Sequence, residues 1–126
     1  MRSDAFRAAA EAKDFSAVDE LFTEDVTFRS PVVFKPYEGR DALRVILSAV
    51  VQVFEGFRYT DQVEDGDVAT LLFKASVGER ELDGIDILRF ADDGRIRELM
   101  VMVRPMSGVH ALAEAMRERL EAAGAV

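Results

Sequence analysis

One acidic residue of this 126-residue chain lies where a carboxyl group can do chemistry. Asp86 stands between Ile85 and Ile87, in an apolar segment that ends at Phe90. If this segment is a buried strand, the Asp86 carboxyl either finds polar partners or stays protonated with a raised pKa. A protonated carboxyl in a dry site can donate a hydrogen bond or a proton to a ligand. The alternative is a structural Asp that is hydrogen-bonded to a neighbouring strand or another nearby donor.

The segments around Asp86 predict a meander of strands. Asp65-Gly66, Gly78 and Asp93-Gly94 are typical of tight turns. Between them, alternating and β-branched residues predict strands over 57–63, 68–77, 79–90 and 95–104. Strand alternation places Asp86, Leu88 and Phe90 on one face of the sheet.

Helical patterns flank this meander. Ser3 is a candidate cap for a first helix that reaches Lys13, and Ser16 with Asp19 resembles a capping box for a second. Apolar spacing predicts a long helix over 40–55 and a last helix that begins near Ser107. A strand over 26–30 ends at Pro31 and is followed by a loop over 32–38. This order predicts an α+β fold with an antiparallel sheet.

Length and composition predict one domain over residues 1–126, with 49% apolar and 32% charged residues. The longest apolar run is too short to span a membrane, and the N-terminus lacks the apolar segment of a signal peptide, so we expect a cytoplasmic protein. The net charge of −8 opposes binding to nucleic acid.

The residue types restrict the chemistry further. The chain has no cysteine, which excludes disulfides, thiolate nucleophiles and zinc–thiolate sites. His110 is the single histidine, so we expect no metal. Gly39-Arg40-Asp41 lacks the glycine spacing and the lysine of a phosphate loop, and we therefore expect no nucleotide cofactor.

The last two predicted strands are apolar on both faces. Residues 85–90 and 99–103 lack the polar alternation of a sheet with one wet face. One face must pack against the helices. We expect the other, which carries Ile87, Met100 and Met102, to form a homodimer through the outer face of the sheet.

The order of elements, with Thr27 to Pro31, Glu38-Gly39-Arg40-Asp41 and the segment from Ile85 through Gly94-Arg95-Ile96, resembles the nuclear transport factor two-like superfamily. That superfamily includes ketosteroid isomerases, SnoaL-like polyketide cyclases and limonene epoxide hydrolases. The resemblance implies a cone-shaped, curved antiparallel or mixed sheet wrapped around the N-terminal helices, here with an additional C-terminal helix. It marks the fold better than the function, because the superfamily hosts enzymes, binders and adaptors.

Only some of the catalytic groups of these enzymes have counterparts in this sequence. Ser30 stands where ketosteroid isomerases have their Asp base, and Phe6 stands where they have a Tyr donor. Asp86 matches their protonated Asp, which is a known example of a carboxylic acid kept neutral at pH 7. Against the epoxide hydrolases, Val101 replaces an acidic residue and Gly84 an arginine. A polyketide cyclase would use a pocket Asp as both acid and base.

The resemblance also implies an apolar cavity inside the cone. Its predicted lining is Phe6, Phe28, Ser30, Tyr37, Leu47, Leu88, Phe90, Leu99, Val101 and Val103. The alternative interpretation of Ser30 is a strand-end serine that satisfies a turn.

Two functions remain open. One is an acid–base isomerase, cyclase or hydrolase that acts on an apolar small molecule with Asp86 as its catalytic residue. The other is a non-catalytic dimeric module that binds a ligand or a protein.

Overall fold

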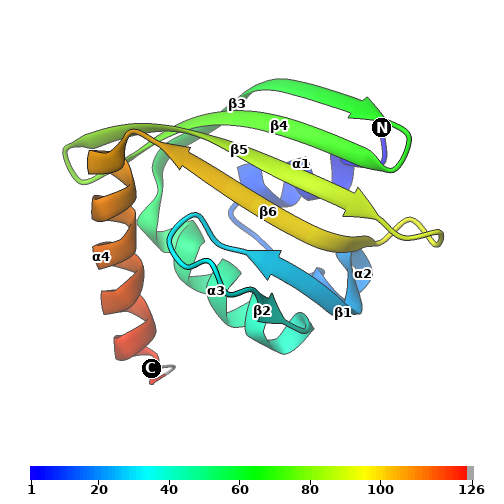
Figure 1. Cartoon of the computed structure of the whole chain (residues 1–126), viewed down its shortest axis with the longest axis horizontal. Coiled ribbons are helices and arrows are strands. Elements are labelled where there is room, and N and C mark those ends of the chain that lie inside the picture. Colours follow the sequence, from blue (N-terminus) through cyan, green and yellow to red (C-terminus); the bar gives the residue numbers. More distant parts are fainter. Residues whose placement is uncertain (125–126) are drawn as a thin grey trace.

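The computed structural model describes residues 1–124, and its main element is a curved six-stranded sheet (Figure 1). The strands follow the order β2-β1-β6-β5-β4-β3 across the sheet. Neighbouring strands are antiparallel except β1 and β6, which are parallel. Their bounds are β1 Phe22–Arg29, β2 Tyr37–Glu38, β3 Glu55–Asp65, β4 Val68–Val77, β5 Arg80–Phe90 and β6 Ile96–Arg104. The sheet is therefore mixed, and the predicted α+β class is confirmed.

The helices enclose the concave side of this sheet (Figure 1). Helix α1 is Asp4–Glu11, the short α2 is Val18–Leu21, α3 is Arg40–Val53 and α4 is Met106–Ala122. Helix α4 descends from the end of β6 and packs beside α3 (Figure 1). None of the helices in residues 1–124 is long and apolar enough to cross a membrane.

Ser3 stands at the N-cap of α1 as predicted, but neither of the two serines caps its helix with its side chain. Ser3 precedes α1, but its hydroxyl donates to Glu64 Oε1 at 2.8 Å instead of accepting a bond from the helix. Ser16 precedes α2 by more than one position, and its backbone N–H donates to Asp14 Oδ1 at 2.9 Å. At Ser3 the Glu64 carboxylate is a stronger partner for the hydroxyl than the helix is, whereas Ser16 lies one residue before the N-cap of α2, which is Ala17.

Strand β5 shows how the sheet separates its two faces. Asp86, Leu88 and Phe90 point inward and are buried, whereas Ile85 and Ile87 point outward and are half-buried. Next to Ile85 and Ile87 lie Leu72 of β4 and Met100 and Met102 of β6, so the outer face carries an apolar strip. We call these five residues the outer apolar strip.

Ion pairs border the outer apolar strip at both ends. At one end Asp83 meets Lys74 at 2.7 Å and Arg104 at 2.8 Å. At the other end Glu98 meets Arg29 at 3.0 Å and Arg89 at 3.2 Å. The outer face thus has an apolar centre and a charged border.

Candidate active site

A cavity of about 730 Å³ lies between the concave face of the sheet and the helices. Its walls come from α1, α3 and α4, from all six strands and from the loop after β1. Most of the lining is apolar and aromatic. Besides Tyr37, its aromatic lining residues are Phe6, Phe15, Phe28, Phe54, Phe57, Tyr59 and Phe73. A mostly apolar cavity with few polar groups is the usual form of a small-molecule site.

Asp86 is the buried carboxyl group of this cavity. Its side chain is 6% exposed, and it points inward from the middle of β5. The Tyr59 hydroxyl donates a hydrogen bond to Asp86 Oδ2 at 2.7 Å, and Tyr59 is itself 7% exposed. One carboxyl oxygen is therefore paired with a phenol, and the other is the oxygen that a ligand in the cavity can use.

Tyr59 reaches this position because β3 contains an irregularity. Near the Asp65-Gly66 turn, Asp61 pairs with Leu72 and Val63 with Thr70, all on the outer face. The register then shifts between Tyr59 and Asp61, and Tyr59 pairs with the inward-facing Phe73. A bulge adds one residue to a strand and so exchanges its faces. Uninterrupted alternation would have placed Tyr59 outside.

Gly84 completes the surroundings of this pair. The Phe73 ring lies directly over Gly84, and a Cβ at this position would come within 2.0 Å of the ring. Phe73 also stacks with Phe57 at 4.8 Å and meets the edge of Tyr59 at 6.2 Å between ring centroids. An arginine at position 84 is excluded by the same ring. Because Gly84 has no side chain, aromatic rings occupy the space beside Asp86 that an arginine side chain would fill.

Burial decides the ionisation of both groups. Burial raises the pKa of the Asp86 carboxyl to about 7, although the hydrogen bond from Tyr59 acts in the opposite direction. Burial, followed by the nearby Asp86 charge, raises the pKa of the Tyr59 phenol well above its usual range. Near neutral pH, Asp86 therefore exists in both protonation states, while Tyr59 stays a hydrogen-bond donor.

Seven of the other residues predicted for the cavity do line it: Phe6, Phe28, Ser30, Tyr37, Leu47, Leu99 and Val101. The Ser30 hydroxyl accepts hydrogen bonds from the backbone N–H groups of Val32 and Val33, at 3.0 and 3.4 Å. Phe6, in the place of a donor, packs against Phe15 and Phe22. These two positions therefore carry neither the carboxylate nor the phenol that the resemblance implies for them.

Three predicted lining residues lie elsewhere. Leu88 is 0% exposed within the packed core, and Phe90 is buried with the Arg2 guanidinium 5.9 Å from its ring centroid. Side chains therefore fill the cone near the end of β5. Val103 borders a smaller hollow of about 290 Å³ between β6 and the loop that carries Phe34.

Four charged or polar residues that line the cavity are exposed to solvent. They are Lys13 and three residues of α4, namely His110, Glu114 and Arg117. The spacing of the α4 residues places them on neighbouring positions of one helix face. Within residues 1–124, no group of three His, Cys, Asp or Glu side chains is arranged to hold a metal ion.

A family model, the SnoaL-like domain, matches residues 4–99. The chain belongs to this family. The SnoaL-like assignment agrees with the resemblance to the nuclear transport factor two-like superfamily that the sequence motifs indicated. None of the curated proteins matches the chain.

Solved structures match this SnoaL-like protein beyond residue 99, over up to 99% of the chain. A steroid delta-isomerase from Pseudomonas aeruginosa is 45% identical, with a TM-score of 0.94 over 99% of this chain and 93% of that one. An uncharacterised bacterial protein with a cystatin-like fold, from Silicibacter pomeroyi DSS-3, is 32% identical, with a TM-score of 0.91 over 95% of this chain and 85% of that one.

A third similar structure shows the fold alone. It is a nuclear transport factor two-like protein of unknown function from Mesorhizobium loti, 23% identical. Its TM-score is 0.73, over 82% of this chain and 88% of that one.

Proposed function

We propose that this protein is an acid–base enzyme of the isomerase or cyclase kind, acting on an apolar small molecule that carries a carbonyl or hydroxyl group. The observation that supports the proposal best is the buried Asp86 carboxyl, paired with Tyr59 at 2.7 Å inside a cavity of about 730 Å³. The 45% identity to a steroid delta-isomerase favours a polycyclic ligand.

Asp86 is the group that exchanges a proton with the ligand. A catalytic acid or base works best when its pKa lies near the working pH, and burial brings the pKa of Asp86 to about 7. The Tyr59 hydroxyl stabilises the ionised form of Asp86, since it donates to one carboxylate oxygen. The mostly apolar walls raise the pKa of Asp86 and strengthen its hydrogen bond with Tyr59.

The serine at position 30 supports a second candidate function, which is ligand binding without catalysis. The resemblance implies a carboxylate base at this place, but the Ser30 hydroxyl is occupied by the N–H groups of Val32 and Val33. Among the described residues that line the cavity, Asp86 and Glu114 are the carboxyl groups, and Glu114 is exposed. A proton would have to be accepted and returned by Asp86 alone.

The test uses a steroid with a ketone and a non-conjugated double bond, because its isomerisation into conjugation is followed by ultraviolet absorption. We expect turnover by the wild-type protein and a loss of about 100-fold or more in kcat for Asp86→Asn. Asp83→Asn is the matched control, since Asp83 lies on the same strand but on the outer face.

Two outcomes contradict the proposed catalytic role of Asp86. Saturable binding without turnover, measured by quenching of tyrosine fluorescence, would support the binding module instead. Equal turnover by wild type and Asp86→Asn would remove Asp86 from the chemistry.

A further inference from the structure

Arg7 of α1 lies near the Tyr59 ring but does not line the cavity. Its guanidinium carbon is 5.6 Å from the centroid of the Tyr59 ring. Arg7 is outside the set of residues in 1–124 that line the cavity, whereas Tyr59 and Asp86 both belong to it. Arg7 can therefore act on the pair without touching a ligand.

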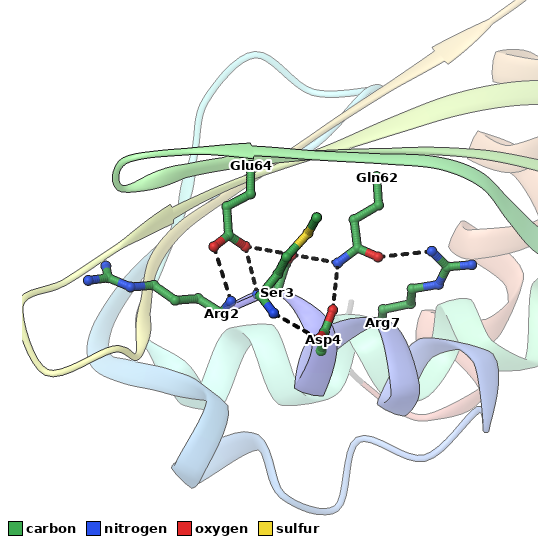
Figure 2. Close-up of polar contacts among 7 residues, drawn as sticks. Arg2, Ser3, Asp4, Arg7, Gln62 and Glu64 are labelled. Atoms are coloured by element: carbon green, nitrogen blue, oxygen red, sulfur yellow. Dashed lines mark hydrogen bonds and ion pairs between the residues drawn. The ribbon is translucent and has the colours of Figure 1, made fainter.

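The Arg7 guanidinium is fixed from two directions. Its Nη1 donates to Gln62 Oε1 of β3 at 2.9 Å, and its Nε donates to Glu11 Oε1 of the same helix at 3.4 Å (Figure 2 shows the Gln62 contact). Gln62 faces α1 by regular alternation from the Asp65-Gly66 turn, whereas the bulge turns Tyr59 onto the same inner face. The Tyr59 ring and the residue that anchors its cation therefore lie on one face of β3.

A polar network holds α1 across β3 at this point (Figure 2). Gln62 Nε2 donates to Ser3 Oγ at 2.7 Å and to Asp4 Oδ1 at 3.0 Å. Glu64 accepts the Ser3 hydroxyl at 2.8 Å, and Ser3 is 0% exposed. The start of α1 is therefore immobilised on the strand that carries Tyr59.

We propose that Arg7 is a positioning residue for the Asp86–Tyr59 pair, holding the Tyr59 ring so that its hydroxyl stays directed at Asp86. The inference rests on the proposed function of that pair. A cation over the face of an aromatic ring is attracted by the ring quadrupole, which restrains the ring. The positive charge of Arg7 also stabilises partial negative charge on the Tyr59 phenol oxygen. The phenol O–H therefore becomes a stronger hydrogen-bond donor to Asp86.

The effect of Arg7 on the Asp86–Tyr59 pair can be measured separately from the other charged groups nearby. Tyr59 faces Arg7 and Glu11 from α1 and Asp86 from β5, and Glu11 opposes the effect of Arg7. Asp86 shares its cavity with Lys13, His110, Glu114 and Arg117, all of which are exposed to solvent. These groups are unchanged in the variants below.

The experiment follows the carbon-13 carboxyl resonance of Asp86 against pH in the full chain. We expect Tyr59→Phe to move the Asp86 titration upward, because the carboxylate loses its donor. Arg7→Met should move it in the same direction by about 0.5 pH unit, the shift that one cation–π contact at a partly exposed site supports. Arg7→Lys, which keeps the charge, should restore most of the wild-type titration.

Two controls separate positioning from general effects. Arg2→Met removes a similar arginine, which lies over a ring without a hydroxyl, 5.9 Å from the Phe90 centroid. Ser3→Ala weakens the docking of α1 and removes one hydrogen bond of Gln62, but it leaves the Arg7–Gln62 hydrogen bond in place. We expect Ser3→Ala to lower stability and both controls to leave the Asp86 titration in place.

The outcomes distinguish this inference from the proposed function. If Tyr59→Phe shifts the titration and Arg7→Met does not, or if Arg2→Met shifts it equally, the role of Arg7 is overturned. If Tyr59→Phe itself has no effect, the Asp86–Tyr59 pair fails and the inference fails with it.

Discussion

Two aspartates of β5, Asp83 and Asp86, lie on the two faces of the sheet and meet opposite electrostatic surroundings. Asp83 points outward, where hydrogen bonds from Lys74 and then Arg104 hold the pKa of its carboxyl below the usual range. Asp86 points inward, where burial raises the pKa to about 7 and a phenol is its partner. Residue type is the same in both, so the face of the sheet decides the chemistry.

This comparison also explains why only one of the two is a candidate for catalysis. A carboxylate paired with two cations is stable as an anion and is a poor proton donor at neutral pH. A carboxyl whose partners are neutral and whose walls are apolar can hold or release its proton there. The inner face supplies the second setting because helices and aromatic rings cover it.

The largest expected effect concerns packing on the inner face. Leu88→Ala should lower the free energy of unfolding by about 2–5 kcal/mol, because Leu88 is 0% exposed and leaves a cavity. The neighbouring Ile87→Ala, on the half-buried outer face, should cost less than half as much. Urea denaturation of both variants at low protein concentration measures the difference, and equal losses would contradict the assignment of the two faces.

Asp86→Asn should stabilise the protein in a pH-dependent way. Because the folded pKa of Asp86 is raised, the folded state binds more protons than the unfolded state between about pH 4 and 7. The contribution of Asp86 to stability is full below its unfolded pKa and is lost as the pH rises through about 7. The advantage of Asp86→Asn over wild type should therefore grow by up to about 1.4 kcal/mol per pH unit in this range.

Chemical denaturation of wild type and Asp86→Asn at pH 5 and pH 8 measures this advantage. Destabilisation by Asp86→Asn at pH 8 would mean that the native protein prefers an ionised, structurally paired Asp86.

The outer apolar strip should mediate association. We propose that the chain forms a homodimer through this face, since Leu72 and Met102 are 39% and 49% exposed between half-buried neighbours. An interface of standard size would cover on the order of 800 Å² per partner. Met102→Asp should weaken association about tenfold or more, because it places a charge in an apolar contact.

Sedimentation at several concentrations tests this proposal. Val45→Asp is the matched control, because Val45 is a similarly exposed apolar residue on α3. A wild-type protein that sediments as a monomer at micromolar concentration would contradict the dimer.

Asp83→Asn should have the smallest effect and the opposite pH dependence. The lowered pKa of Asp83 contributes stability above its unfolded pKa, and this contribution is lost as the pH falls. Because Asp83 and its partners are exposed, the loss at pH 7 should be small and should shrink further in high salt. A large, salt-independent loss would mean that the outer face is covered.

The elements of the fold follow from local patterns. The turns at Gly66, Gly78 and Gly94 and the apolar spacing of α3 determine where strands and helices begin and end. Local signals failed where a distant residue competed, as at Ser3, whose hydroxyl bonds Glu64 across the sheet. The parallel pairing of β1 with β6 is likewise a long-range feature that no short motif indicates.

The site was predictable only in part. The apolar neighbours of Asp86 indicated a buried carboxyl, but Tyr59 was missed because it reaches Asp86 across β4 from a strand that is not its neighbour. Alternation counted from the Asp65-Gly66 turn assigns Tyr59 to the outer face, and only the register shift next to Thr60 reverses it. Such bulges depend on the curvature of the whole sheet, which cannot be predicted from the sequence of one strand.

The most direct test of the account is the titration of the two β5 aspartates in one wild-type sample. A carbon-13 carboxyl spectrum recorded from pH 2 to pH 9, with assignment by Asp83→Asn and Asp86→Asn, reports both residues at once. We expect Asp86 to titrate near pH 7 and Asp83 to titrate below the ordinary value of 3.8. An Asp86 that titrates at or below the ordinary value would contradict a proton-exchanging carboxyl in the cavity.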